Sequence, residues 1–297
     1  MKGLVDVHIH GQGGFDCMGP ASDLLDLSIL LKRQGVSAFL PTFASAPKTR
    51  ILRCLETVGS VTGRERGARI LGVHLEGPFL NPGKRGAQRS SALRLPSLRE
   101  AKEWLSAAPG LVKLVTLAPE MPEAVPLIRF LSRRGVRVSL GHSRATLREA
   151  REAFRAGAAS VTHLFNAMAP LHHREPGLAG WALQEPGVFT EVIADGHHVC
   201  SDMLKWILST RPPEKMILVS DSLPMSLSGL KRGHLAGKDV HLSRDGTLRT
   251  REGALAGSNI RLKDAVERVK KLGVVSARQA EAMASKNPLN MLGICKA

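Results

Sequence analysis

The chain has 297 residues, and 43% of them are hydrophobic, which is ordinary for a globular protein and too high for a disordered one. Its 42 Lys and Arg outnumber its 26 Asp and Glu, giving a formal net charge of +16, but eight Phe, three Trp and no Tyr leave few aromatic platforms for nucleic-acid bases. Without a zinc-finger or RRM signature, nucleic-acid binding is disfavoured, and the charge indicates a solvated surface or a field that attracts a small phosphorylated substrate.

Short apolar or β-branched runs recur along the chain, and helical patterns separate most of them. The predicted strands are Leu4–His10, Val36–Phe43, Arg69–Glu76, Leu111–Leu117, Arg137–His142, Ser160–Leu164, Val188–Ala194 and Lys215–Ser220. The predicted helices between them are Asp23–Gln34, Thr49–Val58, Leu98–Ala107, Pro122–Arg134, Thr146–Ala156 and Cys200–Thr210.

Alternating strands and helices indicate a parallel sheet covered by helices, and eight such units favour closure into an α/β fold of the (β/α)8 TIM-barrel type. The alternative is an open doubly wound sheet, but no GxGxxG motif follows the first strand. After the eighth strand the pattern predicts a short β excursion at about 233–250 and helices at about 262–285. We therefore expect residues 1–297 to form a single barrel domain.

Polar side chains stand where several predicted strands end. Because the carboxyl ends of barrel strands share one mouth, these side chains should converge. Alone, a strand-end His is usually a hydrogen-bonded structural residue and an Asp there a turn residue. Four imidazoles and two carboxylates at one mouth instead indicate a metal site suited to Zn²⁺ or a similar ion. The residues are His8, His10, Glu76, His142, His163 and Asp221. His74 should lie deeper, as a core or supporting residue.

These residues and their neighbours resemble the amidohydrolase superfamily and, within it, the N-acetylglucosamine-6-phosphate deacetylase family. The resemblance runs from one end of the chain to the other. HLEGPF, THLFNAM and DGHH are its most specific elements. The matching stretches are DVHIHG at 6–11, GVHLEGPFLNPGKRGAQ at 72–88, GHSRAT at 141–146, THLFNAM at 162–168, IADGHHV at 193–199, VSDS at 219–222, LAGSNI at 255–260 and NPLNMLGI at 287–294.

The resemblance implies a metal-dependent hydrolase of amino-sugar catabolism that converts N-acetylglucosamine 6-phosphate to glucosamine 6-phosphate and acetate. Glu76, His142 and His163 would hold the principal ion, and His8 and His10 a second one bridged by Glu76, so one or two ions per chain are expected. Zn²⁺ is favoured and Fe²⁺ is an alternative. Asp221 would face the metal and act as the catalytic base that moves a proton from water to the leaving amine.

The resemblance also implies substrate contacts and a partner. The arginine fork of Arg174 suits a phosphate. A homodimer is expected, because relatives complete their phosphate pockets across an interface. The family's flanking β-sandwich segments have no counterpart in residues 1–297, so we expect either a minimal barrel or a fragment of a longer chain. The implied substrate-binding residues are Gln88, Asn166, Ala167, Arg174, His198, Leu255, Ala256 and Gly257.

Two alternatives remain open: a deacetylase of another N-acetylhexosamine 6-phosphate, such as N-acetylgalactosamine 6-phosphate, and a non-catalytic relative that only binds sugar phosphates. The chain turns polar at Asp6, and no run approaches the ~18 apolar residues of a membrane span, so we expect no secretory signal and no membrane contact. The cysteines form no CxxC pair, which is typical of free thiols in a reducing cytoplasm. They are Cys17, Cys54, Cys200 and Cys295.

Overall fold

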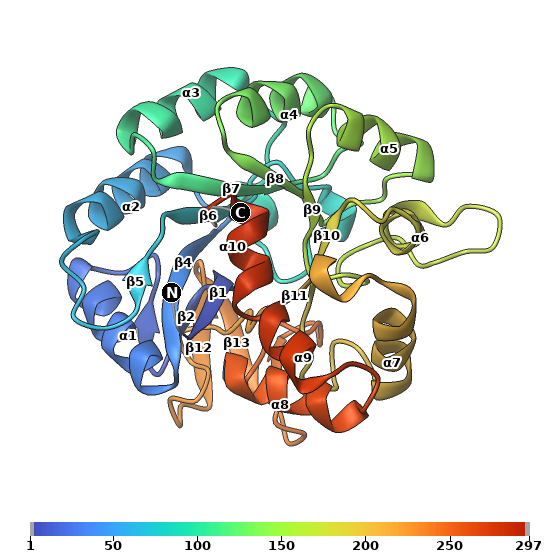
Figure 1. Ribbon diagram of the computed structural model, residues 1–297. Coiled ribbons are helices and arrows are strands. Elements are labelled where there is room, and N and C mark those ends of the chain that lie inside the picture. The colour runs from blue at the N-terminus through green and yellow to red at the C-terminus, as the bar shows by residue number, and fades with distance from the viewer. Residues whose placement is uncertain (1–2, 295–297) are drawn as a thin grey trace.

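The computed structural model describes residues 3–294, and eight parallel strands of its main sheet follow one another in chain order around a barrel (Figure 1). Every neighbouring pair along this order is parallel, as the predicted strand–helix alternation requires. The TIM-barrel prediction is therefore confirmed. The strands are β1 (Leu4–Ile9), β4 (Val36–Ala44), β6 (Val73–Glu76), β7 (Val112–Leu117), β8 (Arg137–Leu140), β9 (Ser160–Val161), β10 (Phe189–Val192) and β11 (Met216–Leu218).

The barrel closes between its first and last strands through backbone hydrogen bonds just beyond β11. The Asp221 N–H donates to the His8 carbonyl at 2.9 Å, and the His10 N–H donates to the Ser222 carbonyl at 2.9 Å. The predicted metal ligands His8 on β1, His10 just after it and Asp221 beyond β11 are therefore brought together by the closure itself.

Most helices form the outer ring of the barrel, whereas Figure 1 shows the last one, near the C-terminus, across the middle of the view. The pattern-based predictions locate most of them, with ends that differ by a few residues. The helices are α1 (Ala21–Arg33), α2 (Lys48–Val61), α3 (Leu98–Ala107), α4 (Ala124–Arg133), α5 (Leu147–Arg155), α6 (Gly177–Gln184), α7 (Ser201–Thr210), α8 (Leu262–Leu272), α9 (Ala277–Met283) and α10 (Lys286–Leu292).

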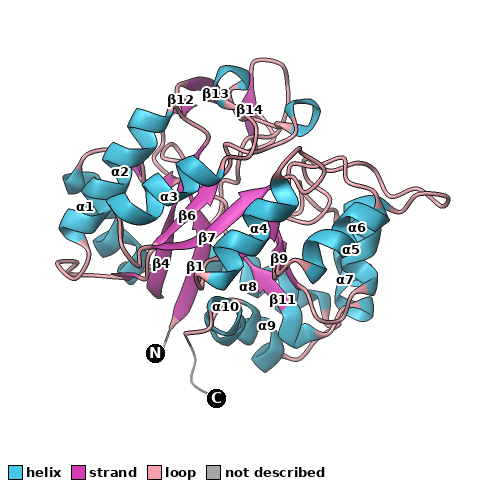
Figure 2. Ribbon diagram, turned by 90° about the horizontal axis from the view of Figure 1, so that it is seen from above, coloured by secondary structure: helices cyan, strands magenta, loops and turns pink. Residues whose placement is uncertain are grey.

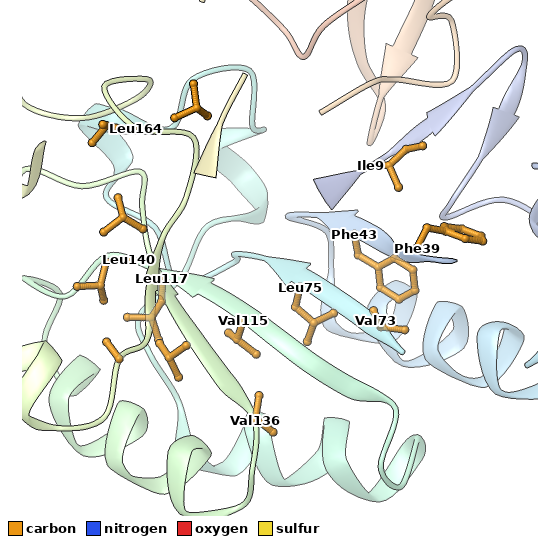
Figure 3. Packing of buried hydrophobic residues seen from close by; sticks show 14 of the residues in the cluster. Ile9, Phe39, Phe43, Val73, Leu75, Val115, Leu117, Val136, Leu140 and Leu164 are labelled. Carbon is orange, nitrogen blue, oxygen red and sulfur yellow. The ribbon is translucent and has the colours of Figure 1, made fainter. Parts of the chain in front are cut away.

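Two apolar layers hold the barrel together. The outer layer lies between the strands and the helices, where Phe39, Leu75 and Val115 are buried (Figure 3). The inner layer fills the barrel at the amino-terminal ends of its strands. There Met291 and Leu292 of α10 pack against inward-facing side chains such as Val7, and Figure 2 shows α10 at that end. Burial of apolar area on this scale is the main stabilising contribution to the fold.

The structure differs from the predicted elements in three places. The strand predicted at 69–76 is split into β5 (Arg69–Ile70) and β6, because Gly72 has a φ of +144° and a Cβ there would lie 2.4 Å from the Leu111 carbonyl oxygen. The strand predicted at 160–164 keeps only Ser160–Val161. Helices α6 and α10 carry no amphipathic signal on the sequence, since they are largely buried on all sides.

Two small sheets lie outside the barrel order. A hairpin joins β2 (Gly11–Gln12) to β3 (Phe15–Asp16), and an antiparallel sheet joins β12 (Arg232–Leu235), β13 (Lys238–Leu242) and β14 (Leu248–Thr250). Figure 2 shows the latter at the end opposite α10, above the carboxyl ends of the strands. Within residues 3–294, no helix has the length and apolar character to cross a bilayer. Cys17, Cys54 and Cys200 are free, and Cys295 lies outside the described residues.

Candidate metal centre and substrate cavity

The structure brings all six predicted ligands together at the carboxyl ends of the strands. They form two groups in which the candidate ligand atoms lie within 4.8 Å of one another. We call them the β1 group, which is His8, His10 and Asp221, and the Glu76 group, which is Glu76, His142 and His163. All six side chains are buried.

Glu76, the last residue of β6, stands between the two groups. Its Oε1 lies 3.0 Å from Nε2 of His142 and 3.1 Å from Nε2 of His163. The same Oε1 lies 3.5 Å from Nε2 of His8, and its Oε2 lies 3.3 Å from Nε2 of His10. One carboxylate therefore faces all four imidazoles, which is the position of a ligand that two ions could share.

Asp221 completes the β1 group from the opposite side. Its Oδ1 lies 3.4 Å from Nε2 of His8 and 3.4 Å from Nε2 of His10. Its backbone is held in place by Gly257, where a Cβ would lie only 2.5 Å from the Asp221 carbonyl oxygen. The Ser258 N–H donates to that same carbonyl at 2.8 Å. The 255–258 segment thus fixes Asp221 from behind.

Three of the imidazoles are oriented through their other ring nitrogen. Nδ1 of His10 lies 3.2 Å from the Thr42 carbonyl oxygen, and Nδ1 of His142 lies 2.9 Å from the Lys84 carbonyl oxygen. Nδ1 of His8 lies 3.1 Å from Oε2 of Glu191. With Nδ1 bonded, Nε2 is the nitrogen left to face the carboxylates, and this is the usual arrangement of metal-binding histidines.

Mutual attraction among these buried groups dominates their charge states when no metal is bound. Burial alone lowers the pKa of His8, but Asp221 and Glu76 outweigh it and raise that pKa to about 10. In the same way burial raises the pKa of Glu76, yet His142 and His8 hold it well below its usual value. The site therefore holds anionic carboxylates that attract positive charge.

The residues fit a divalent cation, as one observation of the described chain shows directly. Nε2 of His8 is completely buried and has no hydrogen-bond partner there, although carboxylate oxygens lie 3.4–3.5 Å away. An orphaned buried nitrogen is costly unless something satisfies it. A metal ion among these nitrogens and oxygens would do so, and such a mixed donor set suits Zn²⁺ and similar ions.

Several site residues have backbone conformations that L-amino acids rarely adopt. The φ angles are +50° at His142, +28° at His163 and +48° at Asp221. Each such residue costs on the order of 1–3 kcal/mol and persists only where the surrounding structure enforces it. The strands end in these turns, so the side chains point into the mouth of the barrel.

A cavity of about 270 Å³ opens over the β1 group and the Glu76 group. Six of the eight predicted substrate-binding residues line it. Ala256 is buried and is not one of its lining residues, and Arg174 lies in an exposed segment with its Nη1 2.8 Å from Nε2 of His173. None of the described residues lining this cavity is a Lys or Arg. The six are Gln88, Asn166, Ala167, His198, Leu255 and Gly257.

His74 lies below the metal groups, as the sequence pattern predicts. Its ring meets that of His8 edge-on at a centroid distance of 4.6 Å. Its nitrogens contact the hydroxyls of Thr42 at 3.3 Å and Thr116 at 2.8 Å, and burial lowers its pKa well below the usual value. His74 is therefore a neutral histidine, hydrogen-bonded to hydroxyls, that packs beneath His8 and supports it.

The sequence analysis assigned no role to two carboxylates of the site, although one of them, Asp195, lies in the DGHH motif. Glu191 of β10 contacts His8, and Asp195 holds His198, with Oδ2 2.7 Å from its Nδ1. Burial alone raises the pKa of Asp195, but the hydrogen bond from His198 lowers it overall. Glu191 could have been predicted to have a buried partner, because it is a charged residue inside the apolar run 188–194 and an acid on a buried strand needs one.

Comparisons with known proteins show which enzymes the chain is similar to. The chain is 37% identical to the N-acetylgalactosamine-6-phosphate deacetylase of Escherichia coli O157:H7 over 294 residues, which are 98% of this chain and 77% of that protein. It is 36% identical to the N-acetylglucosamine-6-phosphate deacetylase of Bacillus subtilis, over 99% of this chain and 75% of the relative.

Solved structures give the same result. The N-acetylglucosamine-6-phosphate deacetylase of Thermotoga maritima superposes with a TM-score of 0.90 at 35% identity, over 99% of this chain and 79% of that one. A mutant of the Mycobacterium smegmatis deacetylase in complex with N-acetyl-D-glucosamine-6-phosphate gives 0.92 at 29% identity, over 99% and 77%. The model of the amidohydrolase family matches residues 1–296, and the chain belongs to that family.

Proposed function

We propose that the protein is an N-acetylglucosamine-6-phosphate deacetylase, a hydrolase of amino-sugar catabolism. One observation carries the proposal: the Glu76 group and the β1 group, which includes Asp221, meet beneath a cavity that His198 and Gln88 also line. Relatives with this name match nearly the whole chain. The chemistry is hydrolysis of the acetamide, with glucosamine 6-phosphate and acetate as products.

We assign the steps of acetamide hydrolysis to residues of this site. When bound to the Glu76 group, a divalent ion makes water more acidic and polarises a carbonyl group. Asp221, at the cavity floor, accepts a proton from the water that adds to the acetamide carbon. It then donates that proton to the nitrogen as the C–N bond breaks, because an amine leaves poorly as an anion. Gln88 and His198 orient the acetamide and the sugar.

Zn²⁺ is the proposed ion, since four imidazoles and two carboxylates form a nitrogen-rich donor set; Fe²⁺ is the alternative. Capacity for two ions is supported by the two groups that share Glu76. We further propose that the enzyme works in the cytoplasm, where the free Cys17, Cys54 and Cys200 would stay reduced.

The phosphate calls for a cation that the cavity of one chain does not supply. Of the described residues lining it, none is a Lys or Arg, whereas Arg174 is exposed, in the segment between β9 and α6. We propose a homodimer in which Arg174 of a second copy binds the 6-phosphate. Light scattering should give twice the chain mass, and Arg174→Ala should raise KM for the phosphorylated substrate far more than it lowers kcat.

Acetate release from N-acetylglucosamine 6-phosphate by metal-loaded protein tests the function. Activity should disappear with a chelator and return with Zn²⁺. Protein that binds the sugar phosphate in calorimetry but releases no acetate would instead be a non-catalytic binder. The E. coli relative named for N-acetylgalactosamine 6-phosphate favours a second candidate substrate, and comparing kcat/KM for the two epimers decides between them.

A further inference from the structure

The carboxylate of Glu191 lies in the interior of the barrel wall with no solvent exposure. Its Oε2 contacts Nδ1 of His8 at 3.1 Å, and its Oε1 has no hydrogen-bond partner among the described residues. His8 is the group that ion-pairs with Glu191 in the described chain. A buried carboxylate is unfavourable unless it is paired, so its presence at this position calls for a function.

The contact decides which nitrogen of His8 faces the metal centre. Because Nδ1 is bonded to Glu191, the lone pair that can bind a metal is on Nε2, which lies 3.5 Å from Oε1 of Glu76 and 3.4 Å from Oδ1 of Asp221. Nε2 itself has no hydrogen bond in the described structure. A carboxylate behind a ligating imidazole fixes its tautomer and increases its basicity.

This partner differs in charge from those of the other oriented ligands. His10 and His142 are held by the backbone carbonyls of Thr42 and Lys84, which are neutral. The negative charge behind His8 is therefore added to the β1 group and not equally to the Glu76 group. A selective increase in cation affinity at the β1 group is the expected result.

We propose that Glu191 is a positioning residue that acts through His8 to give the β1 group its affinity for a second metal ion. The proposal rests on the metal centre assumed in the proposed function, but not on which amide is hydrolysed. Metal binding is its readout, so metal-loaded protein that releases no acetate would overturn the function and leave this inference standing.

The test is Glu191→Gln, which keeps the shape and an acceptor oxygen but removes the charge. Thr190→Val is the matched control: Thr190 is the preceding residue of β10, is equally buried, and has an unpartnered hydroxyl. Metal-stripped proteins are titrated with Zn²⁺ against a chelator of known affinity. In Glu191→Gln we expect one of two sites to weaken about tenfold to a hundredfold, while the other site and the control keep wild-type affinity.

A structural role alone gives a different pattern. If Glu191 merely supported the fold, Glu191→Gln would lower the melting temperature of metal-free protein and leave both affinities unchanged. Under the proposal, one affinity weakens in Glu191→Gln whether or not the loss of the buried His8–Glu191 pair also lowers that melting temperature. Unchanged affinities, or equal weakening of both sites, would overturn it.

A double-mutant cycle tests whether the effect passes through His8. In a His8→Gln background, Glu191→Gln should cause no further loss of metal affinity. A full additional loss would refute the assigned route. Should Glu191→Gln not fold, proton NMR of the wild-type metal-loaded protein decides: the proposal requires a hydrogen-bonded Nδ1–H signal from His8 that is missing in His8→Gln, and its absence from wild type would contradict it.

Discussion

The side-chain amide of Gln88 is held between the backbone and the carboxylate of Glu76. The Ser45 N–H donates to Oε1 of Gln88 at 2.7 Å, so the amide nitrogen faces the site and donates to Oε2 of Glu76 at 2.5 Å. Gln88 therefore helps to fix the carboxylate that both metal groups share, besides lining the cavity. Gln88, which the resemblance implies as a substrate contact, also supports the candidate metal ligand Glu76.

Replacing Gln88 by Leu should impair the centre. The Glu76 carboxylate would lose a hydrogen bond and gain rotational freedom, so we expect kcat/KM to fall about tenfold to a hundredfold and metal to dissociate faster into a chelator. Ser91→Ala, an exposed position on the same loop, is the control. Wild-type metal release by Gln88→Leu would show that Glu76 does not need this contact.

Asp221→Asn should remove the proton transfer. Asparagine keeps the size and a carbonyl oxygen but accepts no proton, so kcat for acetate release should drop at least about a hundredfold. Metal analysis should still find the ion of the Glu76 group, since that group does not include Asp221. The exposed Asp202→Asn controls for loss of a carboxylate in general. Full activity in Asp221→Asn would refute its assignment as the base.

The metal-free protein should lose stability as the pH rises. Burial alone lowers the pKa of His8 and His10, but the Asp221 and Glu76 carboxylates raise the two values to about 10 and about 9. Both lie above the unfolded value of ~6.5, so the folded chain binds more protons, and stability falls with pH between these limits. Their contribution is complete below pH ~6.5 and is lost through pH 9–10.

Urea unfolding of metal-stripped protein at several pH values measures this loss. Metal-loaded protein should show a smaller decrease over the same range, because bound metal replaces the protons on the imidazoles. A metal-free protein that became more stable between pH 6.5 and 9.5 would contradict the charge arrangement described for the β1 group.

Asp195→Asn should act on catalysis without removing metal. The Asp195 carboxylate accepts from Nδ1 of His198 at 2.7 Å and from two backbone N–H groups, so it fixes which His198 nitrogen faces the cavity. An asparagine can reverse that tautomer, and we expect kcat/KM to fall about tenfold or more at unchanged metal content. In a His198→Asn background, Asp195→Asn should cause little further loss of kcat/KM, because Asp195 acts through His198.

A substitution in α10, which packs against the amino-terminal end of the barrel, should lower stability without touching the site. Met291 is almost fully buried in the inner apolar layer, and Met291→Ala should cost about 2–5 kcal/mol of unfolding free energy by leaving a cavity. The exposed Ile294→Ala should cost much less. Equal midpoints in urea for the two variants would mean that α10 does not stabilise the barrel.

The alternation of strands and helices was predictable because each strand is a short apolar run and many helices end at glycine. Such an alternation requires a parallel sheet, and the carboxyl ends of parallel strands meet at one edge of it. His8, Glu76 and Asp221 could therefore be placed together from the sequence. Elements without periodicity were not predictable: α10 is a seven-residue helix that mixes buried apolar residues with a buried Asn287, and β9 is only two residues long.

The sequence by itself determined which residues the centre is made of, because strand ends fix where side chains can meet. Only the tertiary structure decided how they meet: that Glu76 faces all four imidazoles, that Glu191 stands behind His8, and that no Lys or Arg is among the described residues lining the cavity. These facts depend on contacts between strands up to about two hundred positions apart. Such contacts arise from barrel closure, and the local sequence pattern does not identify the partner of a buried residue such as Glu191.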